Sequence, residues 1–337
     1  MMQFFDVCNG DADGLIARHQ FRLSYPIPSD RMTLVTGTKR EVALLSRVDI
    51  RSVAADHVTK GADISVFDIS FDQNAESARC LLEAGATIRY FDHHRASRLQ
   101  PHPHLVAHID TSAHVCTSLI VDKYLNGAHR HWAIAAAFGD NLIETAGQLA
   151  GEANLSAAQT SLLRQLGECI NYNAYGASIN DLHFPPDEIA RRMTHYRSPF
   201  EFAYREDILS RLQIGFAADL QRAEAVLPLH ASSVVAVYVL PDEPWARRVS
   251  GTFANMLVRN NTHRAHAVLS RVANGTNGKY TVSIRAPQNN PQRADAIAIQ
   301  FTNGGGRAAA AGINNLAAQE IARLVSLLEQ TYAATVG

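Results

Sequence analysis

Side chains that could bind a divalent metal recur in the first half of the sequence, each time where a short apolar run ends. In chain order they are Asp11, Asp13, Asp68, His93 and Asp140. Sets that mix carboxylates with imidazole suit manganese, iron or zinc, whereas oxygen-rich sets suit magnesium or manganese. Two ions about 3.5–4 Å apart, bridged by one carboxylate, are the usual arrangement for in-line attack on phosphorus. The pattern therefore indicates a metal centre and, through it, phosphoryl chemistry.

Each motif taken alone has a simpler interpretation. A sequence such as DADG at 11–14 is most often a turn. A single aspartate at a strand end is more often a helix N-cap than a ligand, and the histidines after Asp92 could belong to a solvated loop. The order of the motifs at the ends of successive apolar runs favours one common site.

The apolar runs are typical of strands in a parallel sheet. Residues 4–8, 63–69 and 87–91 have the pattern of short buried strands, and residues 74–84 have helical spacing that ends before Gly85. Strand, helix and strand in that order predict a parallel sheet with crossover helices. Ligands of such sheets bind at the carboxyl ends of the strands, where the predicted metal ligands fall.

The length of 337 residues favours about two domains. We predict an α/β protein with a parallel-sheet domain at 1–155, a helical connector at 156–229 and a smaller C-terminal α/β domain at 230–337. We expect the active site in the cleft between the two α/β domains. The elements predicted for the last domain are strands at 234–240, 263–272 and 279–287, a helix at 250–261 and a closing helix at 316–332.

Composition and charge narrow the class of partner. Lysine plus arginine (31) nearly balances aspartate plus glutamate (32), unlike the basic domains that hold long duplex DNA. No run approaches the roughly 20 apolar residues of a membrane span, and the N-terminus lacks a basic signal sequence. We therefore expect a cytoplasmic protein that binds neither membranes nor long duplex DNA. The sequence leaves the oligomeric state open and is compatible with a homodimer.

Several of these motifs resemble those of one superfamily. FDHH at 91–94 resembles the signature of the DHH phosphoesterases, and GDADG, FDIS, FDHH and FGDN resemble, in that order, their four metal-binding motifs. GGGRAAAAG at 304–312, preceded by VSIR at 282–285, is similar to the DHH-associated C-terminal domain. The resemblance covers nearly the whole chain. The superfamily includes RecJ-like exonucleases, oligoribonucleases, phosphodiesterases of linear and cyclic dinucleotides, and enzymes that hydrolyse pyrophosphate or polyphosphate.

The resemblance implies a role for each of the five predicted metal ligands. Asp11 would bind a first metal and Asp13 a second, and Asp68 would bridge both. His93 and Asp140 would complete the shell of the second metal. The implied cofactors are two divalent ions, manganese in preference to magnesium.

The resemblance also implies contacts with the substrate. His94 would contact a substrate phosphate or act as an acid near it, and Asp92 would orient an imidazole. Arg285 resembles an arginine that reaches a substrate phosphate, for which its planar fork is suited. A loop whose backbone amides bind an anion or approach a base is implied for Gly304, Gly305 and Gly306.

The sequence departs from the superfamily in two places. Asn9 stands where some members have histidine or aspartate, and its amide oxygen would be a neutral, weaker ligand for the first metal. Arg307 follows the three glycines, where histidine is common. This arginine either holds the far end of the substrate or is a solvated loop residue.

The predicted function is that of a two-metal phosphodiesterase that hydrolyses short 5′-phosphorylated oligoribonucleotides to mononucleotides, with linear dinucleotides such as pGpG foremost. A cleft between two modest domains suits a dinucleotide better than a polymer, and RecJ-like enzymes usually carry extra nucleic-acid-binding modules. The alternatives are a cyclic-dinucleotide phosphodiesterase and a 3′,5′-bisphosphonucleotide phosphatase. An alternative of another class is a nucleotide-binding sensor that has lost turnover.

Two groups of residues keep two interpretations each. Tyr172, Tyr175 and Phe184 either pack in a core or stack on a nucleobase. Thr117 and Ser118 either begin a helix or place a hydroxyl near phosphate. No metal site is expected among three histidines of a proline-broken loop, His102, His104 and His108.

Overall fold

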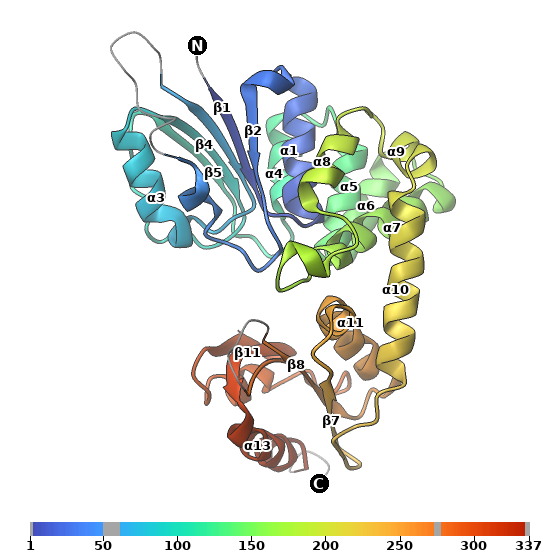
Figure 1. The fold of residues 1–337 in the computed structure, drawn as a ribbon. Helices are drawn as coiled ribbons and strands as arrows, with labels where there is room; N and C mark the ends of the chain where they lie inside the picture. The colour runs from blue at the N-terminus through green and yellow to red at the C-terminus, as the bar shows by residue number, and fades with distance from the viewer. Residues whose placement is uncertain (1–2, 50–60, 273–277, 334–337) are drawn as a thin grey trace. The chain divides into compact units, whose positions relative to one another are not determined.

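The computed structural model of the chain describes residues 3–49, 61–272 and 278–333 (Figure 1). The chain forms two compact units, Met1–Gln213 and Ile214–Gly337. The division falls within helix α10 (Ile208–Glu224). The first unit therefore takes in part of the predicted helical connector, up to residue 213, and the remainder belongs to the second unit.

The first unit contains a parallel sheet with the strand order β2-β1-β3-β4-β5. This confirms the predicted fold class. Strands β2 and β5 were not predicted, because edge strands are only partly buried and carry a weak apolar signal. The strands are β1 (Phe4–Cys8), β2 (Met32–Val35), β3 (Asp63–Phe67), β4 (Thr87–Asp92) and β5 (Leu105–Ile109).

Helices cover both faces of this sheet (Figure 1). Alternate residues such as Val7 and Val66 pack toward α3 (Phe71–Glu83) on one face. Phe67, from the opposite face, contacts Phe21 of α1 with ring centroids 5.5 Å apart. Further helices of this unit are α1 (Ala12–Ser24), α4 (Thr117–Tyr124), α5 (Arg130–Gly139), α6 (Ile143–Glu152), α7 (Ala157–Asn173), α8 (Pro186–Met193) and α9 (Pro199–Arg205), with short 3-10 turns η1 (Ser29–Arg31), η2 (Leu44–Arg47) and η3 (Ile179–Asp181).

Helices α5 and α7 approach each other at two glycines. A Cβ atom on Gly167 would lie 1.8 Å from the Ala135 carbonyl oxygen, and one on Gly139 would lie 2.8 Å from the Gly167 carbonyl oxygen. Only glycine allows backbones to pack this closely. Helix α7 is thus an integral part of the first unit.

The second unit contains a mixed sheet with the order β10-β11-β9-β8-β7-β6, in which β7 and β8 run parallel and the other neighbours antiparallel. The three predicted strands and the helix between them are confirmed. The elements are β6 (His230–Ala231), β7 (Val235–Leu240), α11 (Pro244–Asn260), β8 (Ala265–Arg271), β9 (Lys279–Arg285), α12 (Ala294–Ala298), β10 (Gly304–Arg307), β11 (Ala310–Ala317), η4 (Ala318–Glu320) and α13 (Ile321–Ala333).

Two local predictions for this unit were wrong. The closing helix, predicted from residue 316, begins at Ile321, because Leu316 and Ala317 pair with β9 as the end of β11. The glycine-rich segment is a strand rather than a loop, because Gly304–Arg307 pairs with β11. Both errors arise from strand pairing, which the local pattern of residues does not reveal. Among the residues that the structure describes, none of the helices is both long enough and apolar enough to cross a membrane.

Candidate metal centre

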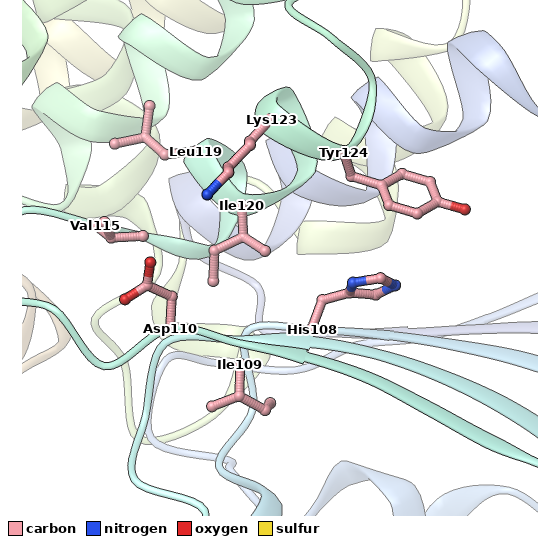
Figure 2. A pocket seen from close by; sticks show the side chains of 8 residues that line it. All are labelled: His108, Ile109, Asp110, Val115, Leu119, Ile120, Lys123 and Tyr124. Atoms are coloured by element: carbon pink, nitrogen blue, oxygen red, sulfur yellow. The ribbon is translucent and has the colours of Figure 1, made fainter.

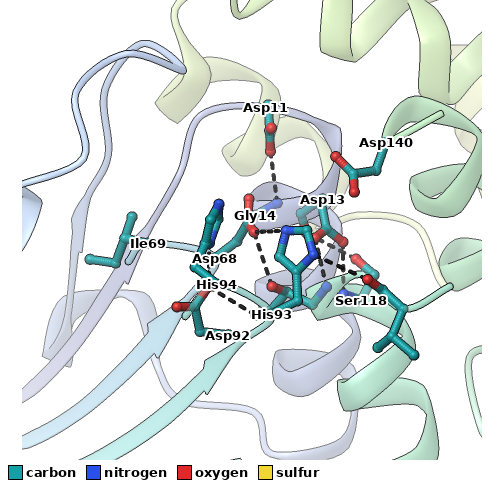
Figure 3. A network of polar contacts seen from close by, with 12 residues as sticks. Asp11, Asp13, Gly14, Asp68, Ile69, Asp92, His93, His94, Ser118 and Asp140 are labelled. Atoms are coloured by element: carbon teal, nitrogen blue, oxygen red, sulfur yellow. Dashed lines mark hydrogen bonds and ion pairs between the residues drawn. The ribbon is translucent and has the colours of Figure 1, made fainter. Parts of the chain in front are cut away.

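The predicted metal ligands of the first unit gather at the carboxyl ends of β1, β3 and β4 (Figure 3). Asp11 and Asp13 lie at the start of α1, directly after β1. Asp68 follows β3, the neighbour of β1 in the sheet, and His93 follows β4. Asp140 comes from the end of α5. The structure thus brings together predicted ligands that lie far apart in sequence.

Asp13 is held by the N-terminus of helix α4. The backbone amides of Thr117 and Ser118 donate to its two carboxylate oxygens, each at 2.7 Å. The positive end of the helix dipole favours a carboxylate at this position. Helix α4 begins at Thr117, so the helix-start interpretation of these residues is confirmed, and their amides orient Asp13.

Asp68 has a left-handed backbone conformation, with φ of 58°. Few residues other than glycine adopt it, and such conformations cluster at functional sites. The Thr117 hydroxyl donates to Asp68 Oδ1 at 3.0 Å. Burial, followed by the charges of Asp13 and Asp11, raises the pKa of Asp68 well above its ordinary value. A cation at this site would relieve that crowding of carboxylates.

His93 presents its Nε2 atom to the carboxylates. Its Nδ1–H donates to the Val115 carbonyl oxygen at 3.1 Å, and Nε2 lies 3.4 Å from Asp68 Oδ1. Burial alone would lower the His93 pKa, but Asp68 and the neighbouring carboxylates raise it to about 10. The outer hydrogen bond fixes the ring orientation as it does in metal-binding histidines.

Asp140 follows the C-terminus of α5, where the helix dipole disfavours negative charge. Burial and then the charge of Asp13 raise its pKa to about 6. Ligand atoms of Asp13, His93 and Asp140 lie within 4.8 Å of one another, as do those of Asp68, His93 and His94. This mixture of oxygen and imidazole donors, short of positive charge, fits a divalent metal ion.

Lys39 belongs to the same site and was not predicted from the sequence. Its Nζ atom donates to Asp11 Oδ2 at 2.5 Å and to Asn171 Oδ1 at 2.9 Å. Burial would lower the Lys39 pKa, but Asp11 raises it well above its ordinary value. Lys39 follows the unpredicted edge strand β2. The residues of β2 are only partly buried, so no apolar pattern marked the position of Lys39 in the sequence.

Asn9 lies beside Asp11 in the same cavity of about 470 Å³. It is 5% exposed, and its Oδ1 atom has no hydrogen-bond partner among the residues that the structure describes. Buried polar oxygens are rarely left unpaired. The Asn9 amide oxygen therefore fits a partner that donates a proton or accepts a lone pair.

Asp92 and His94 form a pair at the edge of this cavity. Asp92 is fully buried, accepts from the His93 backbone amide at 2.9 Å and lies 2.7 Å from His94 Nδ1. The His94 side chain is 45% exposed. Asp92 thus fixes the orientation of the partly exposed His94 ring.

The other predicted substrate contacts belong to the second unit, whereas the residues above belong to the first. Arg285 donates to Asn255 Oδ1 at 2.6 Å and to the Ile284 carbonyl oxygen at 3.0 Å. Arg307 is exposed on β10. A Cβ atom on Gly304 would lie 1.8 Å from the Ala298 carbonyl oxygen, so packing against α12 by itself requires this glycine.

The remaining candidates from the sequence have structural surroundings of their own. Tyr172 and Phe184 are buried, which favours packing over base stacking. The Tyr175 ring centroid lies 5.4 Å from Lys39 Nζ. His108 stacks on Phe91 with centroids 4.7 Å apart and lines a separate pocket (Figure 2).

Comparison with known proteins identifies the C-terminal part and the fold. Residues 231–334 match the family model of the DHHA1 domain, and no curated protein matches the chain at a significant level. Among solved structures, a DHH domain described as a member of a family of ribosomal proteins is 12% identical with a TM-score of 0.66, covering 98% of this chain and 86% of that one.

Two other similar structures carry functional descriptions. RecJ in complex with Mn²⁺ from Thermus thermophilus is 15% identical with a TM-score of 0.65, covering 98% of this chain. This chain spans about half the length of that RecJ, 52%. PggH, a pGpG-specific phosphodiesterase from Vibrio cholerae, is 13% identical with a TM-score of 0.50, covering 98% of this chain and 99% of that one.

The comparisons establish a fold and one domain. The chain has the fold of RecJ and of the solved DHH domain, and residues 231–334 match the DHHA1 domain. The donor set at the carboxyl ends of β1, β3 and β4 is consistent with divalent metal binding.

Proposed function

We propose that this chain is a divalent-metal-dependent phosphoesterase. One observation carries the proposal: Asp13, Asp68 and Asp140 converge with His93 on one site, and two of these carboxylates have raised pKa values. Such a set needs a cation. The fold shared with RecJ, which has been solved with Mn²⁺ and with Mg²⁺, supports the same conclusion.

A bound divalent ion would lower the pKa of a coordinated water and stabilise charge on a phosphoryl group. His93 and the carboxylates around it would hold that ion. His94, held through Nδ1 by Asp92, would direct Nε2 toward a phosphate oxygen or a leaving group. Manganese is the proposed ion and magnesium the alternative.

The proposed substrates are short 5′-phosphorylated oligoribonucleotides, with linear dinucleotides such as pGpG foremost and mononucleotides as products. The likeness to PggH supports this choice, as does the near balance of 31 basic and 32 acidic residues. The cavity volume of about 470 Å³ falls within the range of small-molecule sites, roughly 300–1,000 Å³. Arg285 and the glycines of β10 are the proposed phosphate contacts of the DHHA1 domain.

The experiment that tests the proposal is a substrate panel. Purified protein with Mn²⁺ is incubated with pGpG, with tri- and longer RNAs, with cyclic dinucleotides and with 3′,5′-bisphosphorylated adenosine, and the products are separated. We expect pGpG to be hydrolysed fastest. If another member of the panel is hydrolysed fastest, that compound would replace pGpG as the proposed substrate, and the chain would still be a phosphoesterase. Full activity in excess chelator would contradict the metal-dependent mechanism.

An Asp122→Asn variant provides the matched control. Asp122 is also a buried aspartate, but it does not line the cavity. Its Oδ2 atom forms an ion pair with Arg130 Nε at 2.8 Å. Asp13→Asn should abolish hydrolysis, whereas Asp122→Asn should retain it per folded molecule. Absence of turnover on every substrate, together with tight nucleotide binding, would favour the sensor alternative. The cytoplasmic location and the homodimer remain predictions from the sequence.

A further inference from the structure

The ammonium group of Lys39 is enclosed by oxygen atoms. Asp11 Oδ2 lies at 2.5 Å, Asn171 Oδ1 at 2.9 Å and Asp140 Oδ1 at 4.0 Å from Nζ. The Lys39 side chain is 23% exposed and that of Asp11 is 2% exposed. A lysine in these surroundings is held as a fixed charge, unlike the solvated lysines of a protein surface.

Asp11 is missing from both groups of side chains that could hold a metal. Within the described residues, those groups are Asp13 with His93 and Asp140, and Asp68 with His93 and His94. The predicted ligand of the first metal is therefore the one that Lys39 engages. Its other oxygen accepts from the Gly14 amide at 3.0 Å, so both carboxylate oxygens already have partners.

The second predicted ligand of the first metal adds no charge. Asn9 offers only a neutral amide oxygen, in the place where some members of the superfamily have histidine or aspartate. The single negative charge of Asp11 is balanced by the single positive charge of Lys39. A divalent ion at the same place would meet a repelling ammonium group and a carboxylate that is already paired.

We propose that the Lys39 ammonium takes the place of the predicted first metal, so that the centre holds one divalent ion, bound through His93 and its neighbouring carboxylates. This inference rests on the proposed metal centre and replaces the expectation of two ions. A lysine ammonium has three N–H donors. Among the described residues Asp11 and Asn171 accept from two of them, and the third can donate to an oxygen of a substrate phosphate, as a permanent counterpart to its charge.

The test measures the number of metal ions bound per chain and does not depend on catalytic activity. The protein is dialysed against Mn²⁺, and manganese per chain is measured by mass spectrometry for the wild type, Lys39→Met, Lys39→Met combined with Asn9→Asp, and Lys123→Met. Lys123 lines the separate pocket of Figure 2 and serves as the matched lysine control. Circular dichroism checks that each variant folds.

We expect one ion in the wild type and in Lys123→Met, and two in the double variant, which frees Asp11 and adds a carboxylate beside it. Two ions in the wild type would overturn the inference and leave the metal centre intact. One ion in the folded double variant would also overturn it, because Lys39 would then not be what excludes the second ion. No bound ion in the wild type would refute the proposed metal centre itself.

Electron paramagnetic resonance of the wild type gives an answer that does not depend on any variant. An isolated Mn²⁺ ion gives a hyperfine-split signal whose intensity accounts for all bound manganese. Two ions that share a carboxylate couple magnetically, and the intensity then falls short of the metal content. The inference requires full intensity, and a coupled spectrum would contradict it.

Discussion

Replacing Asp68 by asparagine should make the metal-free protein more stable and the enzyme inactive. Asp68 is 2% exposed, and its pKa is raised by burial and by Asp13 and Asp11. Asparagine removes the charge, and with it the attraction between Asp68 and His93 Nε2. Its carbonyl oxygen can accept from the Thr117 hydroxyl, now 3.0 Å from Asp68 Oδ1, and asparagine tolerates the φ of 58° at this position.

The expected gain in the free energy of unfolding follows from the sign of the pKa shift. A carboxyl group with a raised pKa in the folded state lowers stability wherever it is ionised, so the effect is present in full well above that pKa. An uncompensated buried polar group costs about 1–3 kcal/mol. His93 Nε2, 3.4 Å away, offsets part of the cost. We therefore expect a gain in chelator that grows as the pH is raised and reaches about 1 kcal/mol, the low end of this range.

With manganese bound, the wild type should become more stable than Asp68→Asn, the reverse of the order expected in chelator. At a free ion concentration of about 100 times Kd, binding adds roughly 2.7 kcal/mol to the wild type. The variant should lose most of that increment together with its activity. Urea unfolding is followed by fluorescence of Trp132, which is buried in the first unit, in a Trp245→Phe background. The Asp122→Asn control should respond to manganese as the wild type does.

Two outcomes would refute this reasoning. If Asp68→Asn were less stable than the wild type in chelator, the carboxylates would not be crowded as the structure indicates. If the variant still gained the full manganese increment, Asp68 would not contribute to ion binding. The second result would place the metal nearer to Asp13 and Asp140.

Three further predictions concern single side chains. His94→Gln should lower kcat by about 10²–10⁴-fold, the usual contribution of general acid–base catalysis, with the manganese content unchanged; loss of metal would instead make His94 a ligand. His19 has its pKa lowered to about 3 by burial, so protonation of the unfolded chain should remove about 2 kcal/mol of stability between pH 7 and pH 5. Urea unfolding of His19→Gln at both pH values should show that loss diminished, and an unchanged loss would assign it to other groups. Arg285→Ala should reduce kcat/KM for pGpG by about tenfold to a hundredfold and leave hydrolysis of bis-p-nitrophenyl phosphate nearly unchanged. An equal loss on both substrates would place Arg285 in the catalytic machinery or in the fold.

The parts of the site that could be predicted are those that a local pattern marks. At Asp11, Asp68 and His93 the sequence changes within a few residues from apolar to ligand-bearing, and parallel strands bring such ends to one edge. Strand ends and side-chain chemistry were therefore sufficient to predict that these three residues converge. The same reasoning predicted the parallel sheet of the first unit.

Lys39 could not be found in this way. It follows a short edge strand, β2, whose residues are only partly buried, and lysine does not belong to the usual set of metal ligands. Its partner Asn171 lies 132 positions further along the chain. Contacts over such distances depend on helix packing, which the residue pattern does not encode. The pairing of Gly304–Arg307 with β11 also escaped prediction, because glycines carry no apolar pattern that would mark a strand.

Because Gly139 packs closely against its neighbours, we expect the affinity of the site for cations to depend on how well this part of the core is packed. Gly139 precedes Asp140 and touches Ala12, which separates Asp11 from Asp13, and the Gly167 backbone of the helix that also carries Asn171. A methyl group on Gly139 would clash with both neighbours. It would thereby separate the three segments that contain Gly139, Ala12 and Gly167, each of which carries residues of the site. Selection for metal binding would thus also select for close packing of the core. A variant with a packing defect at Gly139 should lose affinity for the metal ion before its secondary structure changes.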